Sequence, residues 1–528
     1  MSIIAKQLAY MHPDKESLFS DISFSVAQGE KVALVGDNGV GKSTLLQITA
    51  NVLTPSSGEI VFPSPPYYIP QHFGQYSHFT VSQALQIDAK LSALRAILAG
   101  DAAPENFTAL DDDWTIEERA TAALSSWGLD YITPDHSLST LSGGEKTRVF
   151  LAGIAIHDPD IVLMDEPTNH LDHFSRKKLY DLIRTSRATV IVVSHDRTLL
   201  SQLSSIYEMS RSGMAYYAGN YEFYKEQKEL EIEALQGRLE DKEKELRLAR
   251  KVARETAERK QKHEARGKKL NQKKGIGKMA MDTKQDMAEK SGSKLKEVHA
   301  DKMKSIADNI AELQATLPDL KSMKTDFNTS GLHTGKILVT AKGIDYSYGE
   351  SPLWQTPLDF QIKSGERIVI RGGNGSGKTT LLQLITGKLN PVQGELIRSE
   401  FSYVYLDQEY SMINDELTVL QQMEQFAAGM QDHGIKTILN RFLFPYDTWD
   451  KPCRVLSGGE KMKLSLCCLM VSANTPDMFI LDEPTNNIDI RNIEILTATV
   501  RDYKGTVLVV SHDEYFIGQI GTDYSIEL

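Results

Sequence analysis

The sequence predicts an α/β protein in which two similar domains flank a long helical segment of different character. Three observations support this prediction. Four short motifs occur twice in the same order, apolar runs of strand length precede several of them, and the residues between the two copies carry apolar side chains at helical spacing. We expect the domains at residues 1–215 and 336–528, with the helical segment at residues 216–335.

The internal repeat is clearest in its motifs. GDNGVGKS at residues 36–43 recurs as GGNGSGKT at 372–379, and LSGGE, DEPTN and SHD each recur further along the chain. The motif lysines are 336 residues apart and the LSGGE serines 315, so the first domain holds 21 extra residues. We expect these residues to form a surface loop over Leu98–Trp114, between two helices.

Composition excludes several classes of protein. The 528 residues are 41% hydrophobic and 25% charged, as in ordinary globular proteins. The chain has no apolar run of membrane-spanning length and no secretory signal, and its three cysteines have no metal-binding spacing. We therefore expect a cytoplasmic protein that does not bind membranes.

The glycine-rich motif lies between an apolar strand and a helix in both domains. Glycines let successive backbone N–H groups converge on phosphate oxygens, and the helix N-terminus adds a favourable dipole. The lysines would bridge the β- and γ-phosphates of ATP. The residues predicted to bind ATP here are Gly36, Asp37, Asn38, Gly39, Val40, Gly41, Lys42, Ser43 and Thr44, and Gly372, Gly373, Asn374, Gly375, Ser376, Gly377, Lys378, Thr379 and Thr380.

Two adjacent carboxylates end a buried strand in each domain. The first, Asp165 or Asp482, suits a water-mediated Mg²⁺ contact, and we expect Ser43 and Thr379 to complete the two metal sites. The second carboxylate can orient or deprotonate the water that attacks the γ-phosphate, which makes Glu166 and Glu483 the expected catalytic residues.

Polar residues also follow other strands of both predicted sheets. Ligands bind at the carboxyl ends of parallel strands, so we assign His195 and His512 to γ-phosphate contact. Gln71 and Gln408 end shorter strands and are expected to help coordinate Mg²⁺ and the attacking water.

The segment between the domains has a heptad-like rhythm. Apolar residues at spacings of three and four run from Ile232 to Ala253 and again from Met303 to Leu317, with a glycine-punctuated stretch between them. Two such helices running in opposite directions predict an antiparallel coiled-coil hairpin.

The far part of this segment is strongly basic. Residues 247–278 hold thirteen Lys or Arg and three Glu, whereas the rest of the chain carries a net charge of −22. One cationic arm on an acidic protein indicates a polyanionic partner, and RNA fits better than a membrane because the helix lacks an apolar stripe that would insert. The residues predicted to contact RNA are Arg259, Lys260, Lys262, Arg266, Lys268, Lys269, Lys273 and Lys274.

Together the motifs resemble those of the ABC ATPase superfamily. The resemblance implies that LSGGE acts in trans, clamping the γ-phosphate bound by the other domain. The resemblance thus implies two composite sites within one chain, which we expect to be monomeric. It adds six residues to those predicted to bind ATP: Ser142, Gly143, Gly144, Ser457, Gly458 and Gly459. An aromatic residue before the first core strand stacks on adenine in this superfamily; Tyr348 fits in the second domain, and Tyr10 and His12 are alternatives in the first.

The charged insertion, the glutamate in LSGGE and the sequence DEPTNHLD at residues 165–172 resemble the ABC-F family of translation-associated ATPases. That resemblance implies a ribosomal partner, with rRNA and tRNA near the peptidyl-transferase centre, and no DNA. ATP binding would permit ribosome engagement, and hydrolysis would drive release. The second domain departs from the family with Asn487-Ile-Asp489, and housekeeping and antibiotic-resistance roles remain open. The alternative is an energy subunit of a membrane importer, which predicts a short linker instead.

Overall fold

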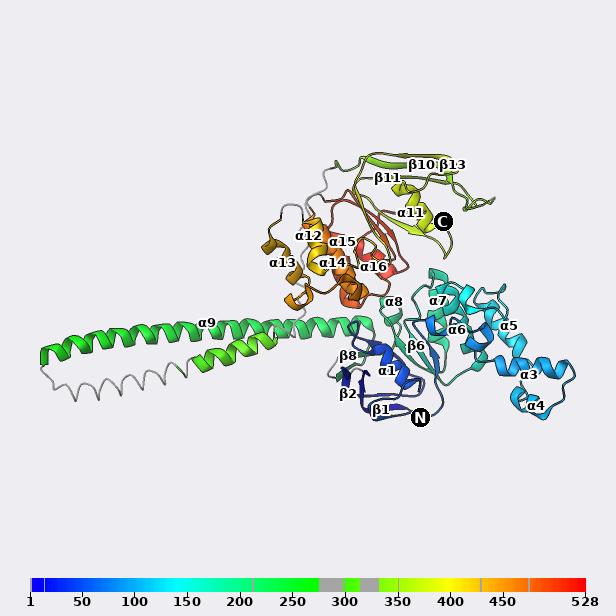
Figure 1. Cartoon of the computed structure of the whole chain (residues 1–528), viewed down its shortest axis with the longest axis horizontal. Coiled ribbons are helices and arrows are strands. Elements are labelled where there is room, and N and C mark those ends of the chain that lie inside the picture. The colour runs from blue at the N-terminus through cyan, green and yellow to red at the C-terminus, as the bar shows by residue number, and fades with distance from the viewer. Residues whose placement is uncertain are drawn as a thin grey trace. The chain divides into compact units, whose positions relative to one another are not determined.

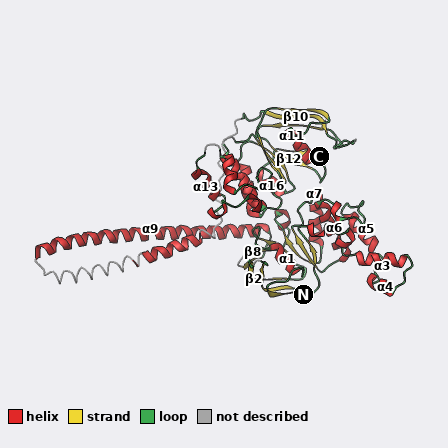
Figure 2. Cartoon of the chain, viewed as in Figure 1, coloured by secondary structure: helices red, strands yellow, loops and turns green. Residues whose placement is uncertain are grey.

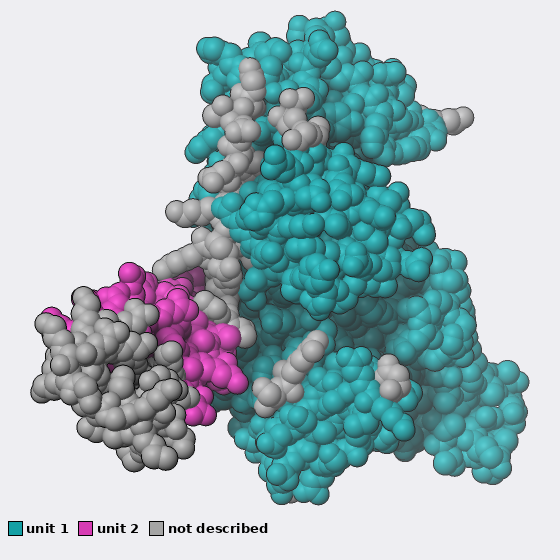
Figure 3. Space-filling view, turned by 60° about the vertical axis from the view of Figure 1, so that its left-hand side comes forward, with its two compact units in different colours: residues 1–223, 321–528 teal, residues 224–320 magenta. Residues whose placement is uncertain are grey.

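The computed structural model describes residues 2–13, 15–210, 213–274, 297, 300–313, 332–349, 351–427, 430–472 and 475–528. Within residues 260–274 it describes the backbone, and side chains only for Lys262 and Arg266. The chain forms two compact units. One comprises Met1–Phe223 with Lys321–Leu528 and contains both α/β domains, and the other comprises Tyr224–Leu320 (Figure 3).

The first domain is built on a six-stranded sheet that is parallel except for its last strand (Figure 1). Its order is β5 (Tyr67–Ile69), β6 (Ile161–Asp165), β7 (Thr189–Val193), β3 (Lys31–Val35), β8 (Ser205–Ser210) and β9 (Gly213–Tyr217). All residues of β6 and β7 are buried, as expected for central strands covered on both faces. A separate antiparallel sheet has the order β2 (Ser17–Val26), β1 (Ile3–Met11) and β4 (Ser57–Val61).

Helices connect the strands of the first domain, as the alternating pattern predicts. They are α1 (Lys42–Thr49), α2 (Val81–Ala84), α3 (Asp88–Leu98), α4 (Pro104–Leu110), α5 (Ile116–Ser126), α6 (Gly143–His157), α7 (His173–Thr185) and α8 (Arg197–Leu200). The expectation of a loop throughout Leu98–Trp114 is wrong, because α4 lies within it. Pro104 begins that helix with a preset φ, and Leu110, which is 1% exposed, anchors its end in the core.

The second domain repeats this plan. Its five-stranded parallel sheet has the order β14 (Tyr403–Leu406), β15 (Met478–Asp482), β16 (Thr506–Val510), β12 (Arg367–Arg371) and β17 (Tyr524–Glu527). An antiparallel sheet has the order β11 (Leu358–Lys363), β10 (Ile337–Asp345) and β13 (Gln393–Arg398). Its helices are α11 (Lys378–Thr386), α12 (Val419–Phe426), α13 (Asp432–Arg441), α14 (Gly458–Val471), α15 (Ile490–Asp502) and α16 (Glu514–Ile520).

The same kind of core holds each phosphate-loop helix against both sheets of its domain. In the first domain, Leu45 and Leu46 of α1 pack among Ile3, Val32 and Ile191, which come from β1, β3 and β7. In the second, Leu381 and Leu384 of α11 pack with the corresponding strands. At about 25 cal/mol per Å² of buried apolar area, such contacts fix the start of each helix firmly relative to the strand ends.

The segment between the domains is helical, which confirms that part of the prediction. Figures 1 and 2 show α9 (Tyr221–Lys274) as one uninterrupted helix of 54 residues. Residues 300–313 are also helical, and Ile306 and Ile310 within them are only 4% and 9% exposed. The glycine-punctuated stretch and Leu317 lie outside the described residues, as do the side chains of Lys260, Lys268, Lys269, Lys273 and Lys274. Over the parts of the chain that the structure describes, no helix combines the length and hydrophobicity needed to cross a membrane.

Two candidate nucleotide sites

Each glycine-rich loop joins the end of a central strand to a helix. Gly41 and Gly377 occupy the N-cap positions of α1 and α11 with φ of 103° and 91°, a left-handed conformation that strains residues bearing a Cβ. The Nζ of Lys42 donates to the carbonyl oxygens of Gly36 and Asp37 at 2.7 and 3.0 Å. In the second domain, Lys378 makes equivalent bonds to Gly372 and Gly373. Both loops therefore fold around their lysine.

The glutamates predicted to be catalytic follow β6 and β15 in an unusual backbone conformation. Glu166 and Glu483 have φ of 47° and 49°, and each N–H donates at 2.8 Å to a carbonyl of the adjacent strand, that of Val193 or Val510. Left-handed non-glycine residues are uncommon and gather at functional sites. The same strained turn in both domains aims the two carboxylates away from the sheets.

The histidine predicted at a strand end in each domain lies beside this glutamate. The Oε1 of Glu166 lies 3.4 Å from Nε2 of His195, and the Oε1 of Glu483 lies 3.3 Å from Nε2 of His512. Burial raises the pKa of Glu483 to about 7, against the opposing charges of Arg176 and Lys378, and also raises the pKa of Glu166. Burial lowers the pKa of both imidazoles, that of His512 to about 3, so both histidines are neutral at pH 7.

The remaining strand-end carboxylates suit a Mg²⁺ site. Asp165 is 1% exposed and hydrogen-bonded to Ser43, and its Oδ1 is buried without a hydrogen-bond partner among the described residues. Asp482 interacts with Thr379 and accepts a 2.7 Å hydrogen bond from the hydroxyl of Tyr405. A hydroxyl beside a carboxylate fits Mg²⁺, which prefers oxygen ligands and keeps several waters.

The LSGGE motifs begin α6 and α14 with the same capping box. Ser142 accepts from the N–H of Glu145, whose carboxylate accepts in return from the N–H of Ser142 at 2.7 Å. Ser457 and Glu460 repeat this arrangement. The glutamate of each motif thus fixes the helix N-terminus and leaves the following glycine N–H groups as donors.

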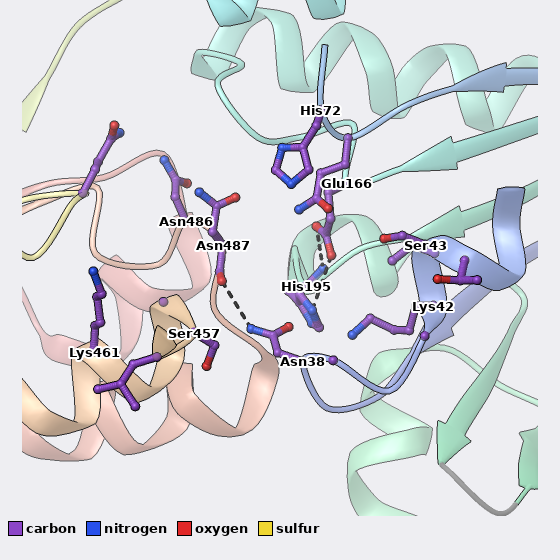
Figure 4. Close-up of a pocket in the computed structure, with 18 of the residues that line it drawn as sticks. Asn38, Lys42, Ser43, His72, Glu166, His195, Ser457, Lys461, Asn486 and Asn487 are labelled. Atoms are coloured by element: carbon purple, nitrogen blue, oxygen red, sulfur yellow. Dashed lines mark hydrogen bonds and ion pairs between the residues drawn. The ribbon is translucent and has the colours of Figure 1, made fainter. Parts of the chain in front are cut away.

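The first candidate site, called site 1, is a cavity of about 700 Å³ lined by both domains. Lys42 and Ser43 face Ser457 across it, with Glu166 and His195 at its wall (Figure 4). Its other predicted lining residues are Asn38, Gly39, Gly41, Thr44, Gln71 and Gly458. A cavity of this size is in the range that holds a nucleotide-sized ligand.

Site 2 is the corresponding cavity of about 550 Å³. Ser142, Gly143 and Gly144 of the first domain line it together with Glu483 and His512 of the second. Asn374, Gly375 and Gln408 complete the predicted lining residues, and Gln408 also reaches site 1. Several predicted residues do not line either cavity but lie in the adjoining loops and helices: Gly36, Asp37, Val40, Gly372, Gly373, Ser376, Gly377, Lys378, Thr379, Thr380 and Gly459.

Contacts between the domains that the sequence did not predict close both sites. At site 1, Asn38 Nδ2 donates to the Asn487 carbonyl at 3.3 Å (Figure 4). At site 2, Asn374 Nδ2 donates to the His170 carbonyl at 2.7 Å. The two asparagines occupy equivalent positions of the glycine-rich loops. Their recurrence in both loops is the sequence feature from which these contacts could have been predicted. Each acceptor lies just after the other domain's DEPTN motif.

Between the two sites lies a cluster of buried charges. Arg176 Nη1 lies 3.5 Å from Oδ2 of Asp196, and Arg197 Nη2 lies 3.2 Å from Oδ2 of Asp513 in the other domain. The Arg197 guanidinium also lies 4.4 Å from the ring centre of Tyr515. Neither arginine could be predicted from the sequence, because nothing in their spacing distinguishes them from surface residues of a helix.

The aromatic residues considered for adenine stacking differ in exposure. Tyr348 is 73% exposed, and its hydroxyl lies 2.9 Å from that of Thr380 beside the second phosphate loop. In the first domain His12 lines site 1, whereas Tyr10 packs against the core beside Phe19. The geometry therefore favours His12 over Tyr10.

Comparison with known proteins agrees with this architecture. The family model described as ABC transporter matches residues 19–169 and 356–486. The chain is 31% identical to ABC transporter F family member 5 of Arabidopsis thaliana, covering 96% of this chain and 72% of that protein. It is 29% identical to the ribosome protection protein VmlR of Bacillus subtilis, covering 95% and 82%.

Among solved structures, archaeal ribosome recycling factor aABCE1 in complex with the ribosomal stalk protein aP1 matches with a TM-score of 0.59. The match covers 99% of this chain and 87% of that one at 19% identity, so it supports the fold alone. The family match and the relatives indicate ATP hydrolysis by two ATP-binding cassettes. The chain belongs to the ABC-F family of tandem-cassette ATPases.

Proposed function

We propose that sites 1 and 2 each bind one ATP between the domains and that their closure allows the chain to engage the ribosome. The observation that carries the ATP-site proposal is the composition of the two cavities. Each combines a glycine-rich loop and a Glu–His pair from one domain with a serine-capped helix N-terminus from the other. ATP held at both ends in this way stabilises the closed arrangement of the domains.

In this proposal the residues act on the triphosphate from both sides. Lys42 and Lys378 hold the β- and γ-phosphates, and the N-termini of α14 and α6 supply N–H donors to the γ-phosphate from the opposite domain. Glu166 and Glu483 orient the attacking water, and the neutral histidines beside them contact the γ-phosphate. Mg²⁺, when bound by Ser43 with Asp165 or by Thr379 with Asp482, neutralises phosphate charge. Gln71 and Gln408 complete the metal environment, and adenine stacks on His12 or Tyr348.

The insertion is proposed to be an antiparallel coiled-coil hairpin. The predicted seam positions of α9, from Ile232 to Ala253, are all partly buried, while Leu230, Leu248 and Val252 off the seam are at least half exposed. The pKa of Glu245 in the middle of α9 is lowered mainly by Lys242 and, to a smaller extent, by the charge of Lys302. Residues 300–313 therefore lie beside the middle of α9. Two helices sharing one apolar seam would form a stiff arm.

The arm is proposed to contact rRNA and tRNA near the peptidyl-transferase centre in the cytoplasm. The relative VmlR is a ribosome protection protein by name. In this chain, Arg259, Lys262 and Arg266 are exposed on α9, and a helix with so many cations would release counterions on binding RNA phosphates. ATP-driven closure would permit ribosome binding, and hydrolysis at the two sites would reset the protein for release.

The test of the ATP-site assignment is the double variant Glu166→Gln with Glu483→Gln. We expect hydrolysis to fall at least about 100-fold while ATP binding persists, because each glutamine keeps the shape but loses the base. Co-sedimentation with ribosomes in ATP should then rise and translation should stop. The matched control is Glu59→Gln with Glu395→Gln, which alters exposed glutamates at equivalent positions of the two domains. Unchanged hydrolysis would refute the site assignment, and association with a membrane complex instead of ribosomes would favour the importer alternative.

The arm is tested by changing Arg259, Lys260, Lys262 and Arg266 to Gln. If these residues contact phosphates, the slope of log affinity against log salt should flatten by about 3, since each lost contact contributes about 0.7–0.9. The control changes four exposed cations on the α/β domains to Gln: Lys6, Arg184, Arg454 and Arg501. Equal slopes for the arm variant and the unaltered protein would remove the arm from the RNA interface.

A further inference from the structure

Arg176 is a buried cation that the ATP-site assignments above do not use. It lies in the first turn of α7, shortly after the DEPTN motif of the first domain, and is 6% exposed. Its Nε donates to the carbonyl of Leu171 at 3.0 Å, and its Nη1 pairs with Asp196. Asp196 also accepts a 2.5 Å hydrogen bond from Tyr180, so the anchor of this guanidinium is itself held in place.

These contacts use the Nε and Nη1 groups of the guanidinium. Arg176 also lines site 2 together with Glu483 and His512, which belong to the other domain. Its Nη2 has no hydrogen-bond partner or ion pair among the residues that the structure describes. A rigidly anchored donor beside a cavity is preorganised for a ligand, because little side-chain entropy remains to be lost.

The charges around Glu483 agree with the position of Arg176 beside site 2. Among the positive charges that oppose the burial of the Glu483 carboxylate, that of Arg176 is the largest, ahead of Lys378 of the phosphate loop. At Glu166 in site 1 the largest such charge is that of Lys42. The foremost cation acting on Glu483 therefore comes from the opposite domain, whereas the foremost cation acting on Glu166 belongs to its own loop.

Site 1 lacks a counterpart because the repeat diverges at this position. Arg176 is the fourth residue after Asp172, and the fourth after the equivalent Asp489 is Ile493. Ile493 is 1% exposed and packs as an apolar core residue of α15. At equivalent positions of the repeat, the first domain therefore has a cation and the second an aliphatic side chain.

We propose that Arg176 is a positioning residue that the first domain supplies in trans to site 2, where it orients Glu483 and offsets charge at the terminal phosphate. This rests on the proposed function of the two sites. Site 2 concentrates negative charge, because Asp482, Glu483 and a triphosphate meet there. A fixed guanidinium placed toward the charge that develops during phosphoryl transfer favours the transition state. Site 1 works without this group, so hydrolysis at the two sites has unequal requirements.

The test isolates each site in the full chain. On a Glu166→Gln background only site 2 hydrolyses ATP, and on a Glu483→Gln background only site 1 does. Arg176→Met should lower kcat about 10- to 100-fold at site 2 and leave KM within about threefold, as for loss of a transition-state donor. At site 1 the change should stay below about threefold. Arg176→Lys, which keeps a charge, should recover part of the rate, and Arg184→Met on the exposed face of the same helix is the matched control.

An equal fall in kcat at both sites, or a rise in KM with kcat unchanged, would overturn the proposal. Arg176→Met leaves Asp196 without its ion pair, so thermal unfolding is measured in parallel. If that variant does not fold, Arg176→Met with Asp196→Asn removes both charges, and the same comparison of sites decides. Failure of the ATP-site assignment is seen separately, because hydrolysis would then persist in the Glu166→Gln, Glu483→Gln double variant whatever residue stands at 176.

Discussion

Sites 1 and 2 share the residues proposed to touch ATP but differ in the residues that surround them. Both are lined by residues of a phosphate loop, by the strained glutamate and by its histidine. The phosphate-loop asparagine of each site, however, donates to the carbonyl of a different residue type. Asn38 donates to Asn487 at site 1, and Asn374 donates to His170 at site 2. The repeat has kept the groups of the reaction and varied the groups that position them, which is how one fold acquires two unequal sites.

The boundary between the domains is also one-sided. The two buried arginines described there, Arg176 and Arg197, both come from the first domain, and the equivalent positions of the second hold Ile493 and Glu514. Glu514 is 39% exposed and pairs with Arg371 of its own domain, where the first domain has Val35. Of the two arginines, Arg197 pairs with Asp513 of the second domain, whereas Arg176 pairs with Asp196 of its own domain and lines site 2 beside Glu483 of the second. This complementarity specifies which faces meet.

The largest difference between the domains should appear on removing Arg197. Arg197→Ala leaves Asp513 buried without its ion pair and strips the cation from the ring of Tyr515. Breaking such a pair costs about 3–5 kcal/mol, or a fall of about 10 °C in the midpoint of thermal unfolding. Glu514→Ala at the equivalent position removes a half-exposed pair and should lower the midpoint by no more than about 3 °C. Similar shifts in the two variants would show that the boundary is not one-sided.

The reactive residues could be predicted from the sequence because their chemistry restricts residue type and spacing together. A phosphate loop requires glycines before a lysine, and a catalytic carboxylate requires the end of a buried strand, so Lys42 and Glu166 were found from local patterns. The helical segment was found in the same way, from apolar residues at regular spacing. Each of these signals is contained within a short stretch of chain.

The residues missed by sequence analysis depend on contacts between distant segments. Arg197 and Asp513 are 316 positions apart, and Asn38 and Asn487 are 449 apart. No local pattern requires an arginine at 176 or 197, because the need arises only when the other domain buries it. The helix α4 was missed for a different reason. The stretch Leu98–Trp114 around it is acidic and alanine-rich and resembles a solvated loop, whereas the burial of Leu110 anchors the helix.

A smaller effect should distinguish the glutamates by pH. Burial raises the folded-state pKa of Glu483 from 4.5 to about 7, so the folded, nucleotide-free protein binds a proton more tightly than the unfolded chain does. The cost of burying this charge is absent below about pH 4.5 and grows to about 3 kcal/mol above pH 7. Glu483→Gln carries no such cost.

The nucleotide-free Glu483→Gln variant should therefore unfold at a higher temperature than the unaltered protein at pH 8, with the difference vanishing below about pH 4.5. His512 titrates in the opposite sense, with a folded-state pKa lowered to about 3, and it destabilises both proteins below about pH 6.5. A stability difference independent of pH would mean that the Glu483 carboxyl titrates alike in the folded and unfolded states.

The smallest predicted effect compares the glycines of the two LSGGE motifs. A Cβ on Gly144 would lie 2.6 Å from the carbonyl oxygen of His170 and 3.0 Å from Nδ2 of Asn374, the two atoms that hydrogen-bond across site 2. A Cβ on Gly459 would instead meet the side-chain amide of Asn492 at 2.2 Å, within its own domain. Backbone cannot yield as a terminal amide can.

With each site isolated by the Glu→Gln backgrounds, Gly144→Ala should lower hydrolysis at site 2 about 10-fold, whereas Gly459→Ala should lower it at site 1 no more than about threefold. The physical reason is that a Cβ at Gly144 collides with the backbone carbonyl of His170, which accepts the hydrogen bond that closes site 2. A Cβ at Gly459 collides only with the Asn492 side chain, which can rotate away. Asn492→Ala provides the control, since removing that amide should relieve Gly459→Ala. If the two alanines prove equally harmful, the asymmetry between the domains does not extend to α6 and α14, the helices that begin at LSGGE, and is confined to the buried arginines.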